Sequence, residues 1–232
     1  MVMLSGLQTA LSGMKVAQNQ MDIIGRNLAN IDTVGYTRKT ALQSNVVLGG
    51  QSAGVQIGDI TRTVNEGLLK SYLASNSTTG NLNAKQQYLG KTETLLGTPQ
   101  GNNSIAANVG NLQSAFESFA SDVTSATSRY NLLNNADTVA SRLNSLTTEI
   151  QKLRGDADLN ISEACDQVND YLDKLQALND QIVKYKVLGY EGVADLEDQR
   201  DQALRELSGL MDISYFKRET GEIVIQTTNG VT

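Results

Sequence analysis

The sequence predicts a mainly α-helical protein: a long N-terminal coiled-coil-type helix, a connector with short β elements, an antiparallel helical bundle, and the start of a β-domain at the C-terminal end. Apolar residues recur at heptad spacing over most of the 232 residues. Glycines and β-branched residues gather in one early stretch, and apolar residues alternate with polar ones near the end. Heptad spacing is typical of packed helices, and alternation is typical of strands.

The first element is a predicted helix within residues 1–34. Its apolar residues lie along one stripe of a heptad frame, which comprises Leu4, Leu7, Leu11, Met14, Met21, Ile24 and Leu28. Such a helix is marginal alone in water, because nucleation is costly and its apolar stripe has no cover. We therefore predict that the stripe is an assembly interface, and that the helix becomes ordered only when it packs against partner helices.

Residues 35–64 are the predicted connector. Five glycines lie between Gly35 and Gly58, and the run GVQIGDITRTV is rich in β-branched residues. Apolar and polar residues alternate imperfectly in this run. The pattern predicts a short extended or hairpin element.

Heptad runs in residues 65–211 predict a slender helical bundle. One run extends over residues 109–126, and the breaks are the loop around Pro99 and the short stretches RGDADLN and VLGYEG. Short breaks favour antiparallel neighbours, so we expect consecutive helices to fold back on each other. At RGDADLN, Gly155 is expected to end one helix and Asn160 to cap the next.

The last segment, residues 212–232, has the alternation of strands. Ile213 and Tyr215 alternate with polar residues, ETGE is a turn sequence, and Ile223 begins a second alternating run. The pattern predicts a β-hairpin. Because an isolated two-stranded hairpin is marginally stable, we expect it to begin a further domain that the sequence contains only in part.

The composition narrows the possible functions. The sequence has no His and one Cys, so the commonest general base is missing, and an intrachain disulfide and a Cys-rich metal site are excluded within these residues. The net charge is −6, with the basic residues scattered, which argues against nucleic acid as a partner. No apolar stretch approaches the roughly 18 residues that span a bilayer, so no membrane partner is expected. We predict no enzymatic activity and no cofactor.

Two features have ordinary structural interpretations. The stretch EGVADLEDQRDQALRE offers Glu197, Asp198 and Asp201 as candidates for paired carboxylates. Asp201 and Arg205 have the spacing of a helical ion pair, which favours a solvated charged face instead. Cys165 lies beside an apolar seam and is expected to be a small packed residue rather than a reactive thiol.

The stretch NLANIDTVGYTR follows the N-terminal helix and carries a family resemblance. It resembles the ANxxTxGY signature of bacterial flagellar axial proteins, the rod, hook and hook-associated families, with Asn30, Thr33, Gly35 and Tyr36 at the matching positions. The stretches NISEACDQVNDYLDKLQALNDQI and DLEDQRDQALRELSGLMDIS are similar to the helical region of the hook-associated family that joins hook to filament. Rod and hook subunits continue into β-rich domains instead. The sequence resembles the N-terminal portion of a junction-family member.

The resemblance implies a structural subunit that joins hook to filament and self-assembles after export through the flagellar type III apparatus. It implies a homo-oligomer in a ring or tubular layer, with the hook protein, the next hook-associated protein and an export chaperone as partners. The implied location is the extracellular flagellum, at the hook–filament junction. In this stretch Asn30 and Asp32 would help to stop the helix, Gly35 would permit the turn, and Tyr36 would anchor the loop by packing. The alternatives are a rod or hook subunit, or a soluble coiled-coil adaptor or secretion chaperone.

Overall fold

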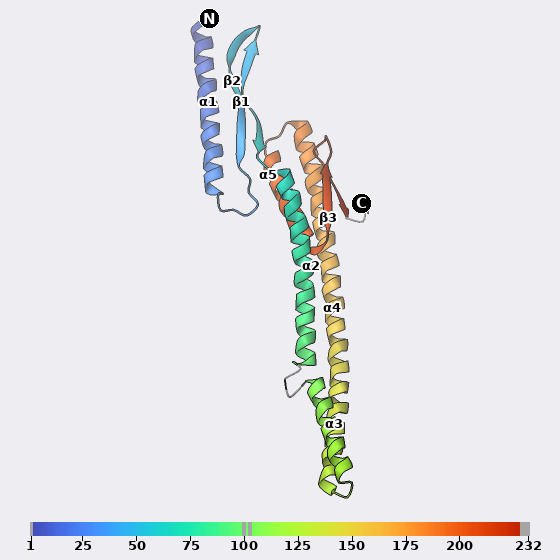
Figure 1. Ribbon diagram of the computed structural model, residues 1–232. Coiled ribbons are helices and arrows are strands. Elements are labelled where there is room, and N and C mark those ends of the chain that lie inside the picture. Colours follow the sequence, from blue (N-terminus) through green and yellow to red (C-terminus); the bar gives the residue numbers. More distant parts are fainter. Residues whose placement is uncertain (1, 99–100, 102–103, 228–232) are drawn as a thin grey trace. The chain divides into compact units, whose positions relative to one another are not determined.

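The computed structural model describes residues 2–98, 101 and 104–227, with side chains from residue 6 onward except that of residue 51. Pro99, the side chain of Leu4 and residues 228–232 lie outside the described part. The elements are α1 (Val2–Ala29), β1 (Lys39–Leu48), β2 (Gln51–Arg62), α2 (Glu66–Leu96), α3 (Ile105–Ser121), α4 (Ala126–Leu188), α5 (Val193–Leu210), β3 (Ile213–Lys217) and β4 (Ile223–Thr227) (Figure 1). The predicted fold class is confirmed.

The chain divides into two compact units. The first unit combines Met1–Gly80 with Gln167–Thr232, and the second unit is Asn81–Asp166. Both long helices, α2 and α4, therefore contribute residues to each unit. The division into residues 1–34, 35–64, 65–211 and 212–232 follows the sequence instead, and it stays a prediction.

The apolar core of the first unit joins three helices and the C-terminal hairpin. Its buried members are Leu69 and Leu73 of α2, Leu175 of α4, Ala203, Leu204 and Leu207 of α5, Ile213 and Tyr215 of β3, and Ile223 of β4. Strands β3 and β4 pair antiparallel, and the Asn179 side chain of α4 hydrogen-bonds both the N–H and the C=O of Ile223, at 3.1 and 2.9 Å. The hairpin is thus stabilised by packing on helices, as a two-stranded sheet requires.

Helices α2 and α5 approach closely at a stretch of small polar residues. The Asn76 side chain donates to the Arg205 carbonyl and to the Ser208 hydroxyl, both at 2.9 Å, and so joins α2 to the last turns of α5. One turn later, a Cβ built on Gly80 would overlap the Gly209 carbonyl oxygen. The sequence SNSTTGN, although poor in helix formers, is therefore the part of α2 that permits this contact.

Strands β1 and β2 form a longer hairpin than the sequence predicts. They pair antiparallel from Lys39↔Arg62 to Leu48↔Gln51, with two register shifts and a turn at Gly49 and Gly50. The two glycines have φ values of 59° and 81°, a region that favours glycine. The irregular register explains why the alternation in the sequence is imperfect.

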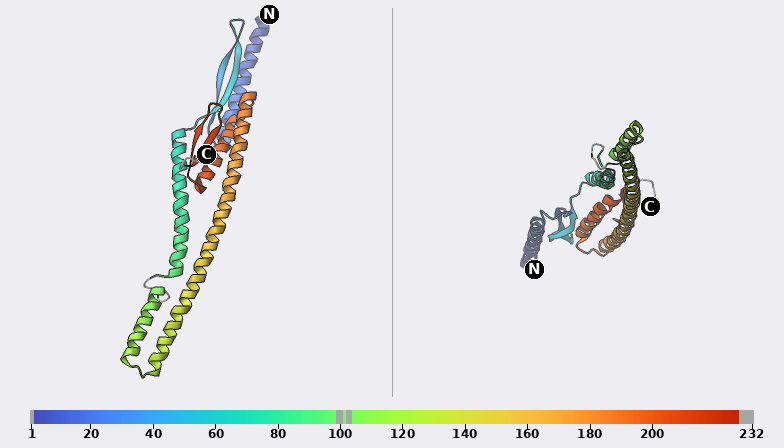
Figure 2. Two further views of the ribbon diagram at one scale, coloured as in Figure 1. Left: turned by 90° about the vertical axis from the view of Figure 1, so that its right-hand side faces the viewer. Right: turned by 90° about the horizontal axis from the view of Figure 1, so that it is seen from below.

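The β1–β2 hairpin packs along one face of α1 (Figure 2). Val16 and Ile23 of α1 are buried, and the Ser12 hydroxyl accepts a hydrogen bond from the Val55 N–H at 3.2 Å. Gly54 gives Ser12 room, because a Cβ at Gly54 would lie 2.5 Å from the Ser12 oxygen. One face of α1 is thus covered by its own chain, a contact that the heptad pattern did not predict.

In the second unit, α3 lies beside the first part of α4, and Ala115 and Leu146 are buried (Figure 2). The two helices are separate, so the single heptad run over residues 109–126 does not correspond to one helix. Asp122 ends the run, since its carboxylate accepts hydrogen bonds from the N–H groups of Thr124 and Ser125 at 3.1 and 3.2 Å. Such local bonds to Asp compete with the helix.

Helix α4 continues through RGDADLN, so the predicted turn there is wrong. Gly155 lies inside the helix rather than at its end, and Asn160 donates to the Tyr88 hydroxyl at 2.7 Å instead of capping a new helix. Ala157 carries the apolar seam across the stretch, and one helical glycine costs only about 1 kcal/mol. Cys165 is exposed on α4, so the prediction of a packed residue is also wrong.

Candidate functional site

The four signature residues form one turn directly after α1. The Asn30 side chain donates to the Arg26 carbonyl at 2.9 Å and accepts from the Thr33 hydroxyl at 3.2 Å. The Tyr36 N–H donates to the Thr33 carbonyl at 3.1 Å. Gly35 has a φ of 88°, and a Cβ there would lie 2.8 Å from the Gln202 side-chain oxygen of α5. The positive φ therefore favours glycine at this turn, and the Gln202 side chain of α5 would have to move to accommodate a Cβ here.

Asn27 connects the end of α1 to the start of β1, and the sequence comparison did not single it out. Its side chain donates to the Lys39 carbonyl at 2.8 Å and accepts from the Lys39 N–H at 2.9 Å. The Tyr36 hydroxyl also donates to the Asn27 side-chain oxygen, at 2.9 Å. Tyr36 therefore holds the loop by a hydrogen bond, and its ring also lies 3.7 Å from the Lys39 ammonium.

The base of the β1–β2 hairpin carries two basic residues that are direct cross-strand partners, Lys39 and Arg62. Like charges in such a position repel each other. Carboxylates of α5 compensate them: the Lys39 ammonium lies 2.8 Å from Asp195 and 2.6 Å from Asp198. The Arg62 guanidinium lies 3.0 Å from Glu197, 3.0 Å from Asp198 and 2.6 Å from Asp201.

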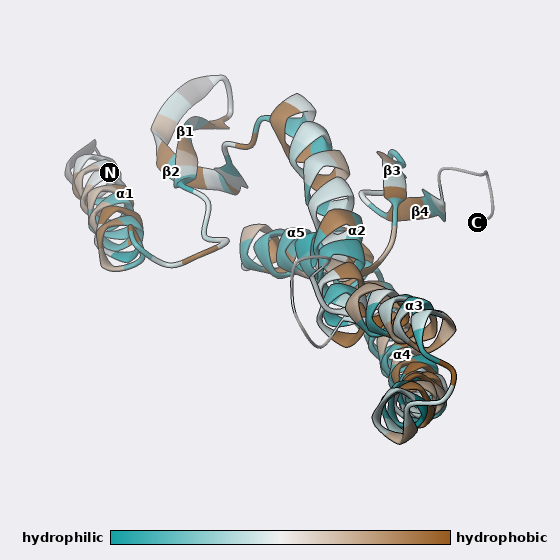
Figure 3. Ribbon diagram, turned by 60° about the horizontal axis from the view of Figure 1, so that its bottom comes forward, coloured by the Kyte–Doolittle hydropathy of each residue, from teal (hydrophilic) through white to brown (hydrophobic). Residues whose placement is uncertain are grey.

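Three of these carboxylates are buried, which corrects the prediction of a solvated face, and only Asp195 is exposed. Although α5 is mostly coloured as hydrophilic in Figure 3, Glu197, Asp198 and Asp201 are only 8, 8 and 4 % exposed. Asp201 pairs with Arg62, which precedes it by 139 residues, instead of with the predicted Arg205. A sequence alone gives no signal for a partner at that separation, because helical spacing reports only local pairs.

The electrostatics keep this cluster charged at neutral pH. Burial opposes ionisation of Asp198, but hydrogen bonds from Lys39, Thr37 and Arg62 outweigh it and lower its pKa below the ordinary value. For Glu197, burial is outweighed by the charges of Arg62, Lys217 and Lys186, and its pKa is lowered too. Burial likewise disfavours the charged form of Lys39, yet Asp195 and Asp198 raise its pKa.

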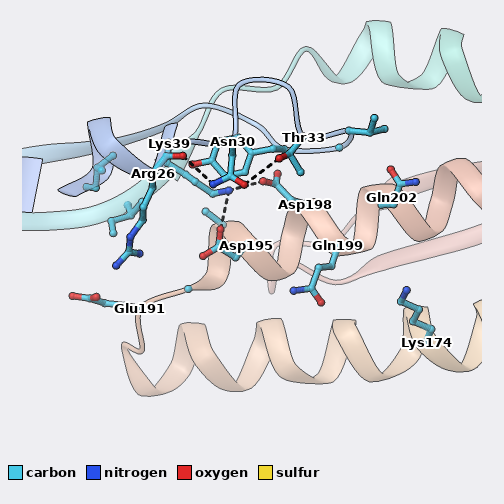
Figure 4. Close-up of a pocket in the computed structure, with 17 residues that line it drawn as sticks. Arg26, Asn30, Thr33, Lys39, Lys174, Glu191, Asp195, Asp198, Gln199 and Gln202 are labelled. Carbon is cyan, nitrogen blue, oxygen red and sulfur yellow. Dashed lines mark hydrogen bonds and ion pairs between the residues drawn. The ribbon is translucent and has the colours of Figure 1, made fainter. Parts of the chain in front are cut away.

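A pocket of about 500 Å³ lies between the signature turn, the start of α5 and α4 (Figure 4). Its lining includes Arg26, Lys39 and Lys174 as well as Glu191 and Asp195. With Asp198 it is lined by three anionic and three cationic side chains, so neither charge is in excess. Within the described residues, no group of three or more Cys, Asp or Glu side chains has a geometry that could hold a metal ion.

The predicted assembly stripe lies on the exposed side of α1. Leu7, Leu11, Met14, Met21, Ile24 and Leu28 are between 45 and 69 % exposed. The side chain of Leu4 lies outside the described residues. Val16 and Ile23, which contact the hairpin side, belong to a different face of the helix. The stripe is therefore open to a partner.

We expect Asn27→Leu to destabilise the first unit by about 1–2 kcal/mol, because it leaves the N–H and C=O of Lys39 without their partner. The measurement is urea unfolding followed by tyrosine fluorescence. Asn19→Leu, a change of the same kind at an exposed position of α1, is the matched control. Equal unfolding free energies for the two variants would contradict the role assigned to Asn27.

Comparison with known protein families gives one match near the N-terminal end of the chain and one over its C-terminal part. Residues 89–232 match the flagellar hook-associated protein FlgK helical domain, and residues 7–37 match the flagella basal body rod protein family. None of the helices in the described part of the chain is long and apolar enough to cross a membrane.

Relatives match along almost the whole chain. Flagellar hook-associated protein 1 of Escherichia coli K12 is 23 % identical over 234 residues, covering 98 % of this chain and 42 % of the relative. The protein of the same name from Salmonella typhimurium LT2 is 25 % identical over 239 residues, covering 99 % and 42 %. This chain thus spans less than half the length of these relatives.

A solved structure has a similar fold. The flagellar hook junction protein FlgK from Burkholderia pseudomallei superposes with a TM-score of 0.61 at 22 % identity, covering 70 % of this chain and 28 % of that one. The flagellar basal-body rod protein FlgG of Bacillus subtilis is 40 % identical over 60 residues, which is 24 % of this chain and 23 % of that protein. The helical-domain match covers more than half of this chain, and the chain therefore belongs to the FlgK family of flagellar hook-associated proteins.

Proposed function

We propose that this chain is the N-terminal part of a structural subunit that joins the hook of the bacterial flagellum to its filament, and that it has no catalytic role. The observation that carries the proposal is the exposed apolar stripe of α1, which its own hairpin leaves uncovered. The names of the relatives, flagellar hook-associated protein 1 and flagellar hook junction protein, support the location.

Assembly is the mechanism. Burying one Leu or Met side chain of the stripe stabilises by about 1.5–3 kcal/mol, and this gain is available only when another helix covers it. The signature turn and the buried charges of Lys39 and Arg62 connect α1 to α5, so that covering the stripe would fix the rest of the subunit as well. Copies of the chain would form a ring or tubular layer with the stripe on its inner side.

The partners follow from that position. The hook protein would lie below the ring and the next hook-associated protein above it, and an export chaperone would hold the subunit before assembly. The subunit would reach the extracellular flagellum through the flagellar type III apparatus. The stripe residues Leu7 to Leu28, and Leu4 with them, would form the assembly interface, and the turn Asn30 to Tyr36 would set the direction of the chain after it.

A rod or hook subunit is the second candidate, because residues 7–37 match the rod protein family. That match covers only α1 and the turn, whereas the helical-domain match covers residues 89–232. A soluble coiled-coil adaptor or secretion chaperone is less well supported, since residues 89–232 match the helical domain of a hook-associated protein.

Deletion of the gene tests the function. We expect cells with hooks of normal appearance but no filaments, and with flagellin released into the medium, as seen by electron microscopy and immunoblotting. Complementation with the intact gene should restore filaments. Rods without hooks would favour the rod or hook candidate, and intact motile flagella would contradict both.

A further inference from the structure

The segment from α1 to β2, residues 2–62, is called the arm here. Every buried member of the first unit's apolar core comes from α2, α4, α5, β3 or β4. Among the described residues, the arm therefore adds none to that core. Its own buried apolar residues, Val16 and Ile23, lie on α1, and α1 packs mainly on the hairpin.

The arm is attached to α5 chiefly by charged and polar contacts. The Thr37 N–H donates to Asp198 at 3.1 Å, and Lys39 and Arg62 form the ion pairs with the α5 carboxylates given above. Beside these contacts lies the pocket of about 500 Å³, lined by Ile23 and Ile60 of the arm and by Ala194 of α5. Apolar packing at this junction is therefore incomplete. The ion pairs contribute a larger share of the stability of the contact between the arm and α5 than they would in a fully packed interface.

The same charges also determine whether the base of the hairpin is stable. Lys39 and Arg62 are cross-strand partners, and they repel each other unless carboxylates lie next to both. Asp198 contacts both, at 2.6 and 3.0 Å. One residue thus closes the hairpin and attaches the arm, so the loss of its charge weakens both contacts at once.

We propose that this cluster is an electrostatic latch: when the α5 carboxylates lose their charge, the arm separates from α5 as a unit while the helical core of the first unit stays folded. The latch would allow the arm to change its orientation, for example when a neighbouring copy covers α1, without unfolding the core. This inference concerns the free protein and stands independently of the proposed function.

Lowering the pH is the simplest way to remove the negative charges of the α5 carboxylates. The groups that face the α5 carboxylates are Lys39 of β1, Arg62 of β2, Lys186 of α4, Arg200 and Asp195 of α5 itself, and Lys217 of β3. All except Asp195 are cationic, and the pKa values of Glu197 and Asp198 lie below the ordinary 4.5 and 3.8. A carboxylate whose pKa is lowered in the folded protein stabilises the fold at pH values above its ordinary pKa. This stabilisation is lost as the pH falls through the lowered pKa. The latch is therefore expected to weaken as the pH falls below these ordinary values and to open as the carboxylates take up protons.

The test is the distance between the arm and α4, measured by pulsed electron paramagnetic resonance. Spin labels are attached at Asn19→Cys on α1 and Lys184→Cys on α4, both exposed positions of the first unit, after Cys165→Ser removes the native thiol. At pH 7 we expect one narrow distance distribution. Asp198→Asn should shift the docking equilibrium by roughly 100-fold or more toward separation and broaden the distribution, because it removes the charge of the carboxylate that contacts both Lys39 and Arg62.

Glu206→Gln is the matched control, since it removes one carboxylate from an exposed position of the same helix. It should leave the distribution narrow. Helical circular dichroism should be the same for both variants, and the labelled protein without further changes should broaden on acidification. Identical narrow distributions for Asp198→Asn and Glu206→Gln would overturn the latch, and so would loss of helical signal in parallel with the broadening.

Discussion

Leu11→Asp and Met21→Asp are each expected to abolish incorporation into the flagellum while leaving the subunit folded. Both side chains are exposed in the free chain, at 45 and 65 %, so a carboxylate there costs little before assembly. After assembly, the same carboxylate would be buried among apolar side chains without a partner, at a cost of several kcal/mol. Summed over every copy in a ring, this cost would prevent the ring from forming.

The measurement combines immunoblotting of isolated hooks with immunoblotting of the culture medium. The variants should be found in the medium and be missing from the hooks, and the purified variants should keep the thermal unfolding temperature of the unmodified protein. Asn19→Asp is the control, because it adds the same charge on an exposed face of α1 outside the stripe. Normal incorporation of Leu11→Asp, or failure of its helical core to fold, would contradict the proposed interface.

Two glycine-to-alanine substitutions are expected to change stability in opposite directions. At Gly80, the added methyl group would overlap the Gly209 carbonyl and push α2 and α5 apart, which costs about 3 kcal/mol. The better helix propensity of alanine returns only about 1 kcal/mol. The net result is a loss of about 2 kcal/mol in the first unit, together with weaker hydrogen bonds from Asn76.

At Gly155 a Cβ meets no atom within 4 Å, and the residue lies inside a continuous helix. Gly155→Ala should therefore stabilise the second unit by about 1 kcal/mol. Urea unfolding with amide hydrogen exchange, read separately for residues of each unit, measures both effects. A destabilised Gly155→Ala would indicate that the helix is interrupted at this point, as the sequence RGDADLN first suggested.

Local patterns predicted the elements well and their partners poorly. The heptad frame of α1 and the alternation at Ile213 and Tyr215 both correspond to real elements, because a side chain's position along a helix or strand depends only on local spacing. Gly155 misled the prediction, since one glycine does not break a helix whose apolar seam continues on both sides. The turn at Asp122 was missed because its side chain competes for backbone groups within an otherwise helical run.

The candidate site shows the same limit. Asn30, Thr33, Gly35 and Tyr36 were singled out by their resemblance to a signature, and their hydrogen bonds join residues at most nine positions apart in the sequence. Lys39, Arg62 and the α5 carboxylates have no such local pattern. Asp198 looked like an ordinary surface acid because its cationic partners lie 136 and 159 residues away in the sequence.

The shared carboxylates are also expected to restrict how this chain can be recombined with its relatives. Lys39 and Arg62 depend on the same residues of α5, so a chimaera that exchanges residues 2–62 between distant relatives would bring together charges selected in different backgrounds. Such a chimaera should tolerate the exchange only when α5 is transferred with it. The effect of a substitution at one of these positions is therefore expected to depend on the residues at the others. The arm and α5 would then change together, although they lie far apart in the sequence.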